Sequence, residues 1–278
     1  MPQTVTRFAP SPTGWPHLGH AYAAKVARDL AKQDEGRFLL RFEDIDHTRV
    51  RPEYYDAIET DLHWLGLDWD GPALRQSDRT TAYAAALEDL RHIGVAYPCF
   101  CTRREIEDEV ARMISAPHGP EGALYPGTCR RLSEDERNTR LADGQQPAWR
   151  LDAGKAAEIT GPLSFTDLRH GHIPVDPTLL GDVVLARKDI GTSYHLAVVV
   201  DDSFQQVTHV TRGEDLLPST HVHRILQTLL GFPEPVYLHH ALVVDENGVR
   251  LAKRHDSLSI RSLREAKLTP PDLLARLP

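Results

Sequence analysis

The first 95 residues alternate between short apolar segments and longer amphipathic ones, and this alternation limits the folds that the chain can adopt. Residues 4–8 and 37–44 are short and largely apolar, as buried strands are. Residues 18–33, 53–65 and 80–93 carry apolar side chains at spacings of three and four, which predicts helices. Strands that alternate with helices form parallel sheets. The sequence therefore predicts an α/β fold with a parallel sheet.

A segment of different texture separates this half of the chain from a second one. It is rich in Pro and Gly near residues 115–129, and Thr102/Glu105 and Ser133/Glu136 are each spaced as a capping box. From about residue 182 we expect strands in VVLAR, LAVVVDD and QQVTHVTRGED, then a helix over 220–230 and an apolar run over 237–244. These patterns predict a catalytic sheet domain in two halves, at residues 1–96 and 182–235. An insertion at residues 97–181 separates the halves, and a short final segment follows at residues 236–278.

Composition excludes several classes of protein. Hydrophobic residues make up 41% and charged residues 26% of the 278, the balance of a globular domain rather than a disordered one. The net charge of −8 disfavours a strong non-specific hold on nucleic acid. The start has no apolar signal segment, and no apolar run approaches the ~20 residues of a membrane helix. We expect a cytoplasmic protein with no membrane association, and nothing in the sequence indicates an obligate protein partner.

Two histidines lie three residues apart where the first predicted helix begins. A helix N-terminus presents unpaired backbone N–H groups and partial positive charge, which suit a phosphate group. His17 and His20 share one helix face, and Gly19 between them allows a ligand to approach the backbone. The GxxxxGK[ST] and GxGxxG nucleotide motifs are absent from the sequence. The pattern predicts a phosphate site, with two surface histidines as the alternative.

The sequence blocks around these histidines resemble a known family. Residues 7–20, RFAPSPTGWPHLGH, are similar to the opening of the glutamyl class of class I aminoacyl-tRNA synthetases, in which a HIGH-type motif binds ATP. The segment RFED at 41–44, the segments around Tyr194 and Arg212, and GVRLAKR at 248–254 follow in the family's order. The resemblance covers nearly the whole chain. It implies a Rossmann-like nucleotide-binding catalytic domain of the HIGH and KMSKS type.

That resemblance implies activation of L-glutamate by ATP with Mg²⁺. His17, His20 and Lys253 would be catalytic, and these three residues with Gly19 would bind ATP. No protein nucleophile is needed, so positioning and charge stabilisation would supply the catalysis. The KMSKS-like loop departs from the family pattern at Arg250, Ala252 and Arg254. These replacements keep the charge of the loop but remove a hydroxyl contact.

The amino-acid specificity implied by the resemblance is for glutamate. Arginine suits a carboxylate better than lysine does because its guanidinium group is planar and bidentate. Arg7 and Arg212 would hold the γ-carboxylate near Tyr194, and Glu43 would hold the ammonium group. The expected glutamate-binding set is Arg7, Phe8, Ala9, Pro10, Ser11, Glu43, Tyr194 and Arg212.

All three cysteines fall in the expected insertion, at positions 99, 101 and 129. Three cysteines do not make a disulfide framework in a chain of this length, and with reduced thiols the CxC pair and the distant third cysteine suit zinc. The family resemblance implies a structural Zn²⁺ held by Cys99, Cys101, Tyr125 and Cys129. From ligand chemistry alone, His118 is the alternative fourth ligand, and three inert buried thiols are the alternative to a metal site.

Only 24 residues follow Arg254, whereas full-length members of the family continue into helical anticodon-reading domains. We therefore expect no anticodon-binding domain. Together with the cysteine pattern, this resembles truncated paralogues that activate glutamate without tRNA and attach it to the queuosine base in the anticodon of tRNA(Asp). The alternatives are a compact enzyme that charges the 3′ end of tRNA(Glu) and a non-catalytic paralogue that binds ATP or glutamate.

Two further groups of residues allow more than one interpretation. Six arginines of the expected insertion could hold an RNA backbone or could belong to a solvated helix face: Arg103, Arg104, Arg130, Arg131, Arg137 and Arg140. Four histidines suggest no metal geometry, and we expect them to be structural or surface residues: His221, His223, His239 and His240.

Overall fold

The structure is a computed structural model, and it describes residues 3–112, 118–119, 122–243, 259–275 and 277–278. The helices and strands are, in chain order, β1 (Val5–Phe8), α1 (Leu18–Gln33), β2 (Arg37–Phe42), α2 (Pro52–Trp64), β3 (Leu74–Arg75), η1 (Gln76–Arg79), α3 (Thr80–Ile93), β4 (Ala96–Cys99), α4 (Arg103–Arg112), β5 (His118–Gly119), β6 (Gly122–Ala123), η2 (Thr128–Arg131), α5 (Glu134–Ala142), β7 (Ala148–Leu151), α6 (Ala153–Thr160), β8 (Ser164–Asp167), β9 (Gly171–Pro174), β10 (Val184–Ala186), α7 (Tyr194–Phe204), β11 (His209–Gly213), η3 (Glu214–Leu216), α8 (Leu217–Leu229), β12 (Val236–His240), α9 (Ile260–Glu265) and α10 (Pro270–Leu274). The predicted helices over 18–33, 53–65 and 80–93 are confirmed as α1, α2 and α3.

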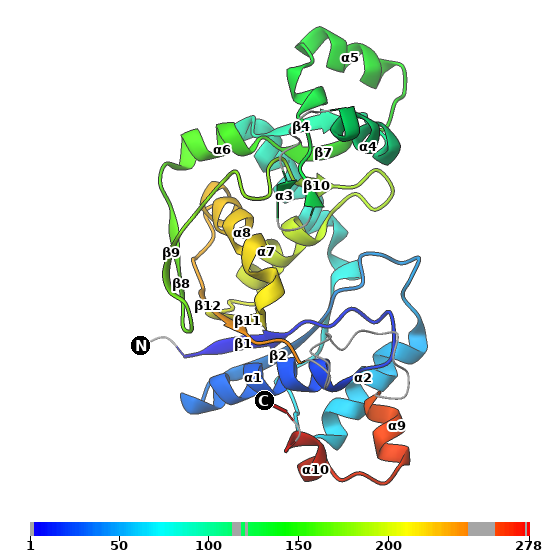
Figure 1. The fold of residues 1–278 in the computed structure, drawn as a ribbon, viewed down its shortest axis with the longest axis vertical. Coiled ribbons are helices and arrows are strands. Elements are labelled where there is room, and N and C mark those ends of the chain that lie inside the picture. Colours follow the sequence, from blue (N-terminus) through cyan, green and yellow to red (C-terminus); the bar gives the residue numbers. More distant parts are fainter. Residues whose placement is uncertain (1–2, 113–117, 120–121, 244–258, 276) are drawn as a thin grey trace.

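The centre of the molecule is a set of parallel strands. β1, β2 and β3 pair in parallel, and so do β11, β12 and β8, with β9 antiparallel at the edge. Thr208, just before β11, donates a backbone hydrogen bond of 3.0 Å to the Val5 carbonyl of β1. The two groups of strands therefore lie side by side (Figure 1). Their carboxyl ends meet at one edge, where α/β proteins bind ligands.

A second, antiparallel sheet lies at the far end of the molecule. It has the order β10–β7–β4, and α4, α5 and α6 surround it (Figure 1). The hairpin β8–β9 comes from the same stretch of sequence but extends the parallel sheet through β12. The sequence-based division into residues 1–96, 97–181, 182–235 and 236–278 stays a prediction.

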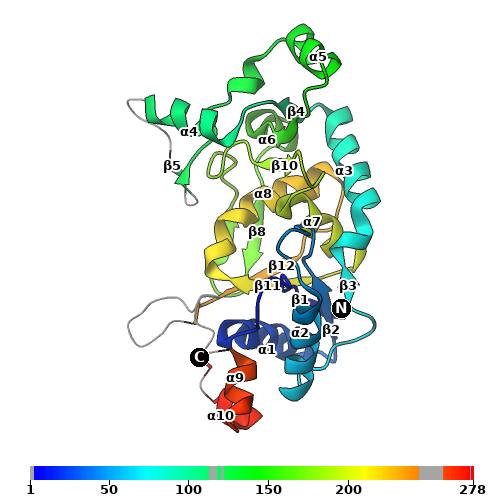
Figure 2. The ribbon, with the colours of Figure 1, turned by 90° about the vertical axis from the view of Figure 1, so that its right-hand side faces the viewer.

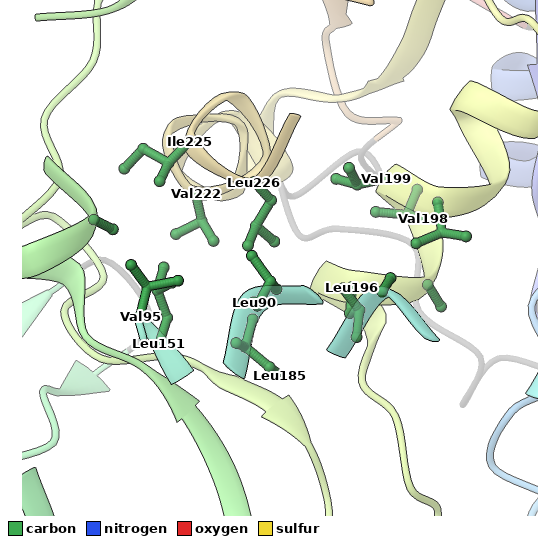
Figure 3. Packing of buried hydrophobic residues seen from close by; sticks show 14 of the residues in the cluster. Leu90, Val95, Leu151, Leu185, Leu196, Val198, Val199, Val222, Ile225 and Leu226 are labelled. Atoms are coloured by element: carbon green, nitrogen blue, oxygen red, sulfur yellow. The ribbon is translucent and has the colours of Figure 1, made fainter. Parts of the chain in front are cut away.

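The prediction of a strand in LAVVVDD is wrong, because these residues belong to helix α7. All seven, Leu196 to Asp202, are buried in the structure. A helix that is covered on every side needs no polar face, so its sequence has no helical period and resembles a buried strand. Figure 3 shows its apolar side chains against those of α3, α8 and β10. This cluster packs α3, α7 and α8 against the second sheet.

The last two helices pack beneath the first half of the chain, beside α1 and α2 (Figure 2). Ile260 at the start of α9 donates a backbone hydrogen bond of 2.8 Å to Pro16, next to the histidine pair. Arg264 lies 3.1 Å from Asp61 of α2. The chain therefore returns to the start of α1 at residue 259. Across the described parts of the chain, no helix has the length and apolarity needed to cross a bilayer.

Candidate active site

A cavity of about 470 Å³ opens where β1, β11 and β12 end and α1 begins. Glu43 follows β2, and Tyr194 begins α7 at the same cavity. The lining includes all the predicted catalytic, glutamate-binding and ATP-binding residues but one: Arg7, Phe8, Ala9, Pro10, Ser11, His17, Gly19, His20, Glu43, Tyr194 and Arg212. Lys253, with the KMSKS-like segment around it, lies outside the described residues. Residues far apart in the sequence thus line one space.

The predicted histidine pair forms the N-terminal cap of α1. The backbone N–H of Gly19 donates to Nδ1 of His17 at 3.1 Å, and the backbone N–H of His17 donates to Nδ1 of His20 at 3.2 Å. In the neutral ring each Nε2 therefore carries the proton and acts as a donor. The ring centroids lie 4.0 Å apart. A Cβ at Gly19 would come within 2.9 Å of the His17 ring, so a side chain there would require that ring to shift.

Arg7 has a protein counter-ion. Its Nε donates to Asp202 of α7 at 2.8 Å, and its Nη1 donates to the Thr211 carbonyl at 3.0 Å. Asp202 also accepts from Arg41 at 2.7 Å, and both arginines are buried. Burial alone would raise the pKa of Asp202, but the two guanidinium groups hold it below its ordinary value. Arg7 is thus at once a cavity-lining residue and part of a buried ion-pair network.

Glu43, which directly follows β2, brings a carboxylate to the cavity wall. Its Oε1 lies 3.7 Å from Nη2 of Arg41. Burial raises the pKa of Glu43 above its ordinary value, and the nearby Arg41 and Arg7 oppose that shift. A cation bound in the cavity would therefore stabilise the ionised form of this carboxyl group.

Arg212 differs from the other buried arginines because its partners are all neutral. Its Nη1 donates to the Tyr194 hydroxyl at 3.2 Å and to Nδ1 of His223 at 3.0 Å. Its Nε donates to Nε2 of His239 at 3.2 Å, and its Nη2 donates to the Thr220 hydroxyl. Among the described residues, no carboxylate lies within 4.0 Å of this guanidinium group. Arg212 is only 6% exposed, so it is a buried cation in the cavity wall, and no carboxylate of the described residues is in direct contact with it.

The sequence did not identify the residues that hold Arg212. The four histidines expected to be structural or surface residues are all buried. Burial and then the charge of Arg212 lower the pKa of His239 to about 4 and hold the pKa of His223 well below its ordinary value. Both rings are therefore neutral and accept from Arg212. A histidine in a strand or helix carries no sequence signal for such a contact, because its direction depends on strand order.

The three cysteine sulfurs gather within 4.8 Å of one another. The Tyr125 hydroxyl lies 3.4 Å from the Cys99 sulfur and 3.5 Å from the Cys101 sulfur, and the sulfurs of Cys101 and Cys129 are 3.4 Å apart. Zinc–sulfur bonds of about 2.3 Å place tetrahedral sulfurs about 3.8 Å apart. Three thiols and a phenol at these separations fit a four-coordinate zinc site. The side chain of His118, the alternative ligand, lies outside the described residues.

The basic residues of the insertion have partners within the chain. Arg103 and Arg104 pair with Glu107 and Asp108 on their own helix. The other four contact acids, carbonyls or aromatic rings close by: Arg130 with Asp182, Arg131 with Pro126, Arg137 with Arg130 and Tyr97, and Arg140 with Phe100. Arg103 and Arg104 remain exposed on their helix, as the solvated-face interpretation expects.

Comparisons of the sequence with family models and with known proteins point to the same family. The model of the catalytic domain of class I tRNA synthetases (E and Q) matches residues 3–277. A protein named glutamyl-Q tRNA(Asp) synthetase from Rhodobacter capsulatus is 48% identical over 97% of the chain and 98% of its own length. One of the same name from Nocardia farcinica is 46% identical over 98% of the chain and 82% of its own length.

Solved structures agree on the fold. The chain matches a glutamate tRNA ligase from Elizabethkingia meningosepticum, solved in complex with its amino acid, with a TM-score of 0.77 and 30% identity. The match covers 91% of this chain and 52% of that one, so the chain spans about half the length of that structure. A methionyl-tRNA synthetase from Mycobacterium tuberculosis matches with a TM-score of 0.56 at 12% identity, which supports the fold alone.

Proposed function

The chain belongs to the class I tRNA synthetases of the E and Q type and has their α/β catalytic fold, and on that premise we propose that it activates L-glutamate with ATP. The glutamate α-carboxylate attacks the α-phosphorus of ATP. A bond forms between them, the bond to the β-phosphate oxygen breaks, and pyrophosphate leaves. The product is glutamyl-adenylate.

The single observation that carries this proposal is the uncompensated charge of Arg212. A buried cation without a counter-ion is costly, and a carboxylate brought by a ligand removes that cost. Tyr194 accepts from Arg212 and keeps its own O–H to donate to the same carboxylate. A neutral amide in that place would leave the charge unpaired. The pocket therefore favours glutamate over glutamine, with the γ-carboxylate at Arg212 and the ammonium group at Glu43.

The proposed ATP site lies at the start of α1. The Nε2–H groups of His17 and His20 donate to phosphate oxygens there, and the helix N-terminus adds partial positive charge. Mg²⁺ accompanies the ATP and offsets its phosphate charge. Residues Phe8 to Ser11, which follow Arg7 in the chain, also line the cavity. Activation therefore depends on position and charge rather than on a protein nucleophile.

We assign Cys99, Cys101, Tyr125 and Cys129 to a structural zinc site. Such an ion, when bound, would link β4 to the segment before α5, where few apolar side chains are buried. Arg150 lies over the Tyr125 ring, with its guanidinium carbon 3.9 Å from the ring centroid. This cation suits the negative charge that thiolate ligands bring.

We propose further that the activated glutamate passes to the queuosine base of tRNA(Asp). A hydroxyl of the base attacks the glutamyl carbonyl, an ester bond forms, and AMP leaves with the displaced oxygen. The support is the names of two relatives, which this chain covers over 98% and 82% of their own length. The diol of that base offers adjacent hydroxyls, as a terminal ribose does.

The test is transfer of labelled glutamate to purified tRNA. We expect ATP-dependent label on tRNA(Asp) that contains queuosine, and none on tRNA(Asp) from cells that cannot make it. Label on tRNA(Glu) instead would overturn the assignment and favour the compact glutamyl-tRNA synthetase. A protein that forms no pyrophosphate from glutamate and ATP would fit the non-catalytic alternative.

A further inference from the structure

Three adjacent parallel strands place charged and polar side chains in a row behind the cavity. Asp167 ends β8, His239 lies on β12 and Arg212 lies on β11, and Arg212 and His239 are register partners. Figure 1 shows the three strands side by side. Asp167 and His239 are fully buried. Neither lines the cavity, so neither is a contact residue for a ligand.

The hydrogen bonds along this row leave only one proton arrangement. A guanidinium group can only donate, so Nε2 of His239 must accept from Arg212. The neutral ring then carries its proton on Nδ1, which donates to Asp167 at 2.6 Å. The Asp167 carboxylate can only accept, which enforces the same tautomer from the other side.

The Asp167 carboxylate is itself fully occupied. One oxygen accepts from the backbone N–H groups of Arg169 and His170, both at 2.9 Å. The other accepts from the backbone and the ring of His239. Four donors thus fix its position. The carboxylate is separated from Arg212 by a neutral ring and does not neutralise it by direct contact.

We propose that Asp167 and His239 are specificity-determining positioning residues, which hold Arg212 in place through neutral acceptors so that its charge remains for the substrate carboxylate. A carboxylate in direct contact would hold Arg212 equally well but would remove the attraction for an anionic side chain. The inference deepens the proposed function and rests on it. It names residues that select glutamate over glutamine without touching either.

His223 has the same role on the other side of Arg212. Its Nδ1 accepts from Nη1, and its Nε2 lies 3.2 Å from Nδ1 of His195. The ring therefore carries its proton on Nε2 and donates it to His195. Arg212 is held from two sides by imidazole rings with opposite tautomers.

Asp167→Asn is the first test. An asparagine has one carbonyl oxygen, so its amide NH₂ must face N–H donors on one side of the carboxylate position. When the amide NH₂ faces His239, it donates to Nδ1, so the imidazole proton must move to Nε2. There the proton faces the N–H of Arg212, and the hydrogen bond to Arg212 is lost. We expect at least tenfold weaker glutamate binding by calorimetry and at least a tenfold smaller preference for glutamate over glutamine, with ATP affinity within threefold. Nitrogen NMR of labelled histidine should show the His239 tautomer change.

The matched control is Asp182→Asn. Asp182 is buried to a similar degree and accepts from Tyr97, Arg130 and the Ala153 backbone, but it has no contact with Arg212. The Asp182→Asn protein should lose thermal stability and keep the wild-type preference for glutamate. A folded Asp167→Asn protein whose NMR spectrum shows the changed His239 tautomer, but which keeps the wild-type preference for glutamate, would overturn the inference.

A pair of substitutions at 239 covers the case in which Asp167→Asn does not fold. In His239→Gln the amide oxygen can take the place of Nε2, whereas in His239→Asn the shorter amide reaches only the Nδ1 position. We expect glutamate affinity within threefold of wild type for His239→Gln and at least tenfold weaker for His239→Asn. Equal affinities in the two variants would refute the inference alone. A wild-type protein that does not prefer glutamate would refute the proposed function as well.

Discussion

Replacing Arg212 with methionine should abolish selective glutamate binding. Methionine has a similar length but no charge and no donor, so the γ-carboxylate of glutamate would enter a buried site without a cation. Arg212 is 6% exposed, and removing one partner of a buried pair costs about 3–5 kcal/mol. Since 1.4 kcal/mol corresponds to a factor of ten, we expect about 10²- to 10⁴-fold weaker binding.

The assay is calorimetric titration with glutamate and with glutamine. The wild-type protein should prefer glutamate strongly, and Arg212→Met should bind both weakly and about equally. Thermal unfolding gives a second readout, because a ligand raises the melting temperature only if it binds the folded state. Glutamate should stabilise the wild type and leave the melting temperature of the variant unchanged.

Arg224→Met is the matched control. Arg224 is also mostly buried, and it bonds the Ser164 carbonyl at 3.1 Å and Glu234 at 2.8 Å, but it does not line the cavity. Its loss should lower stability and leave glutamate affinity within threefold of wild type. If Arg212→Met bound glutamate as the control does, the assignment of the γ-carboxylate to Arg212 would be wrong.

Three further predictions concern the rest of the site. His20→Ala should slow glutamate-dependent exchange of pyrophosphate into ATP by about 10²–10³ without changing glutamate affinity, and an unchanged exchange rate would remove His20 from the phosphate site. Purified protein should contain one zinc per chain by atomic absorption, a chelator should lower its melting temperature, and Tyr125→Phe should hold zinc more weakly; a melting temperature unaffected by chelation would exclude the site. Burial, and then the charge of Arg212, lower the pKa of His239 from its ordinary 6.5 to about 4 in the fold. As the pH drops, the unfolded chain therefore binds the proton before the folded one does, and the stability of the fold decreases between about pH 6.5 and pH 4. In urea unfolding at pH 7 and pH 4.5, His239→Gln should lose less stability than wild type, by up to about 3 kcal/mol, and identical losses would contradict the buried neutral ring.

The gathering of the motif residues around one cavity was predictable from the sequence. Arg7 ends a strand, His17 begins the next helix and Arg212 ends a later strand. Parallel strands place their carboxyl ends at one edge, so residues at those positions meet even when the chain separates them widely. The helices over 18–33 and 80–93 were likewise predictable, because each has one apolar face against the core.

The residues that hold the arginines of the cavity in place were not predictable from the sequence. Helix α7 has no polar face to give it a helical period, so its contribution of Asp202 to Arg7 and Arg41 could not be inferred. The bond between Asp167 and His239 depends on β8 lying beside β12, a pairing set by tertiary packing rather than by local sequence. The sequence identifies residues that face a ligand more readily than residues that orient them.

A crystal structure with bound glutamate tests the central claim most directly. The account predicts the distal carboxylate within hydrogen-bond distance of Arg212 and the Tyr194 hydroxyl, with the ammonium group at Glu43. Glutamate bound elsewhere, or glutamine bound in the same pose with equal affinity, would contradict it.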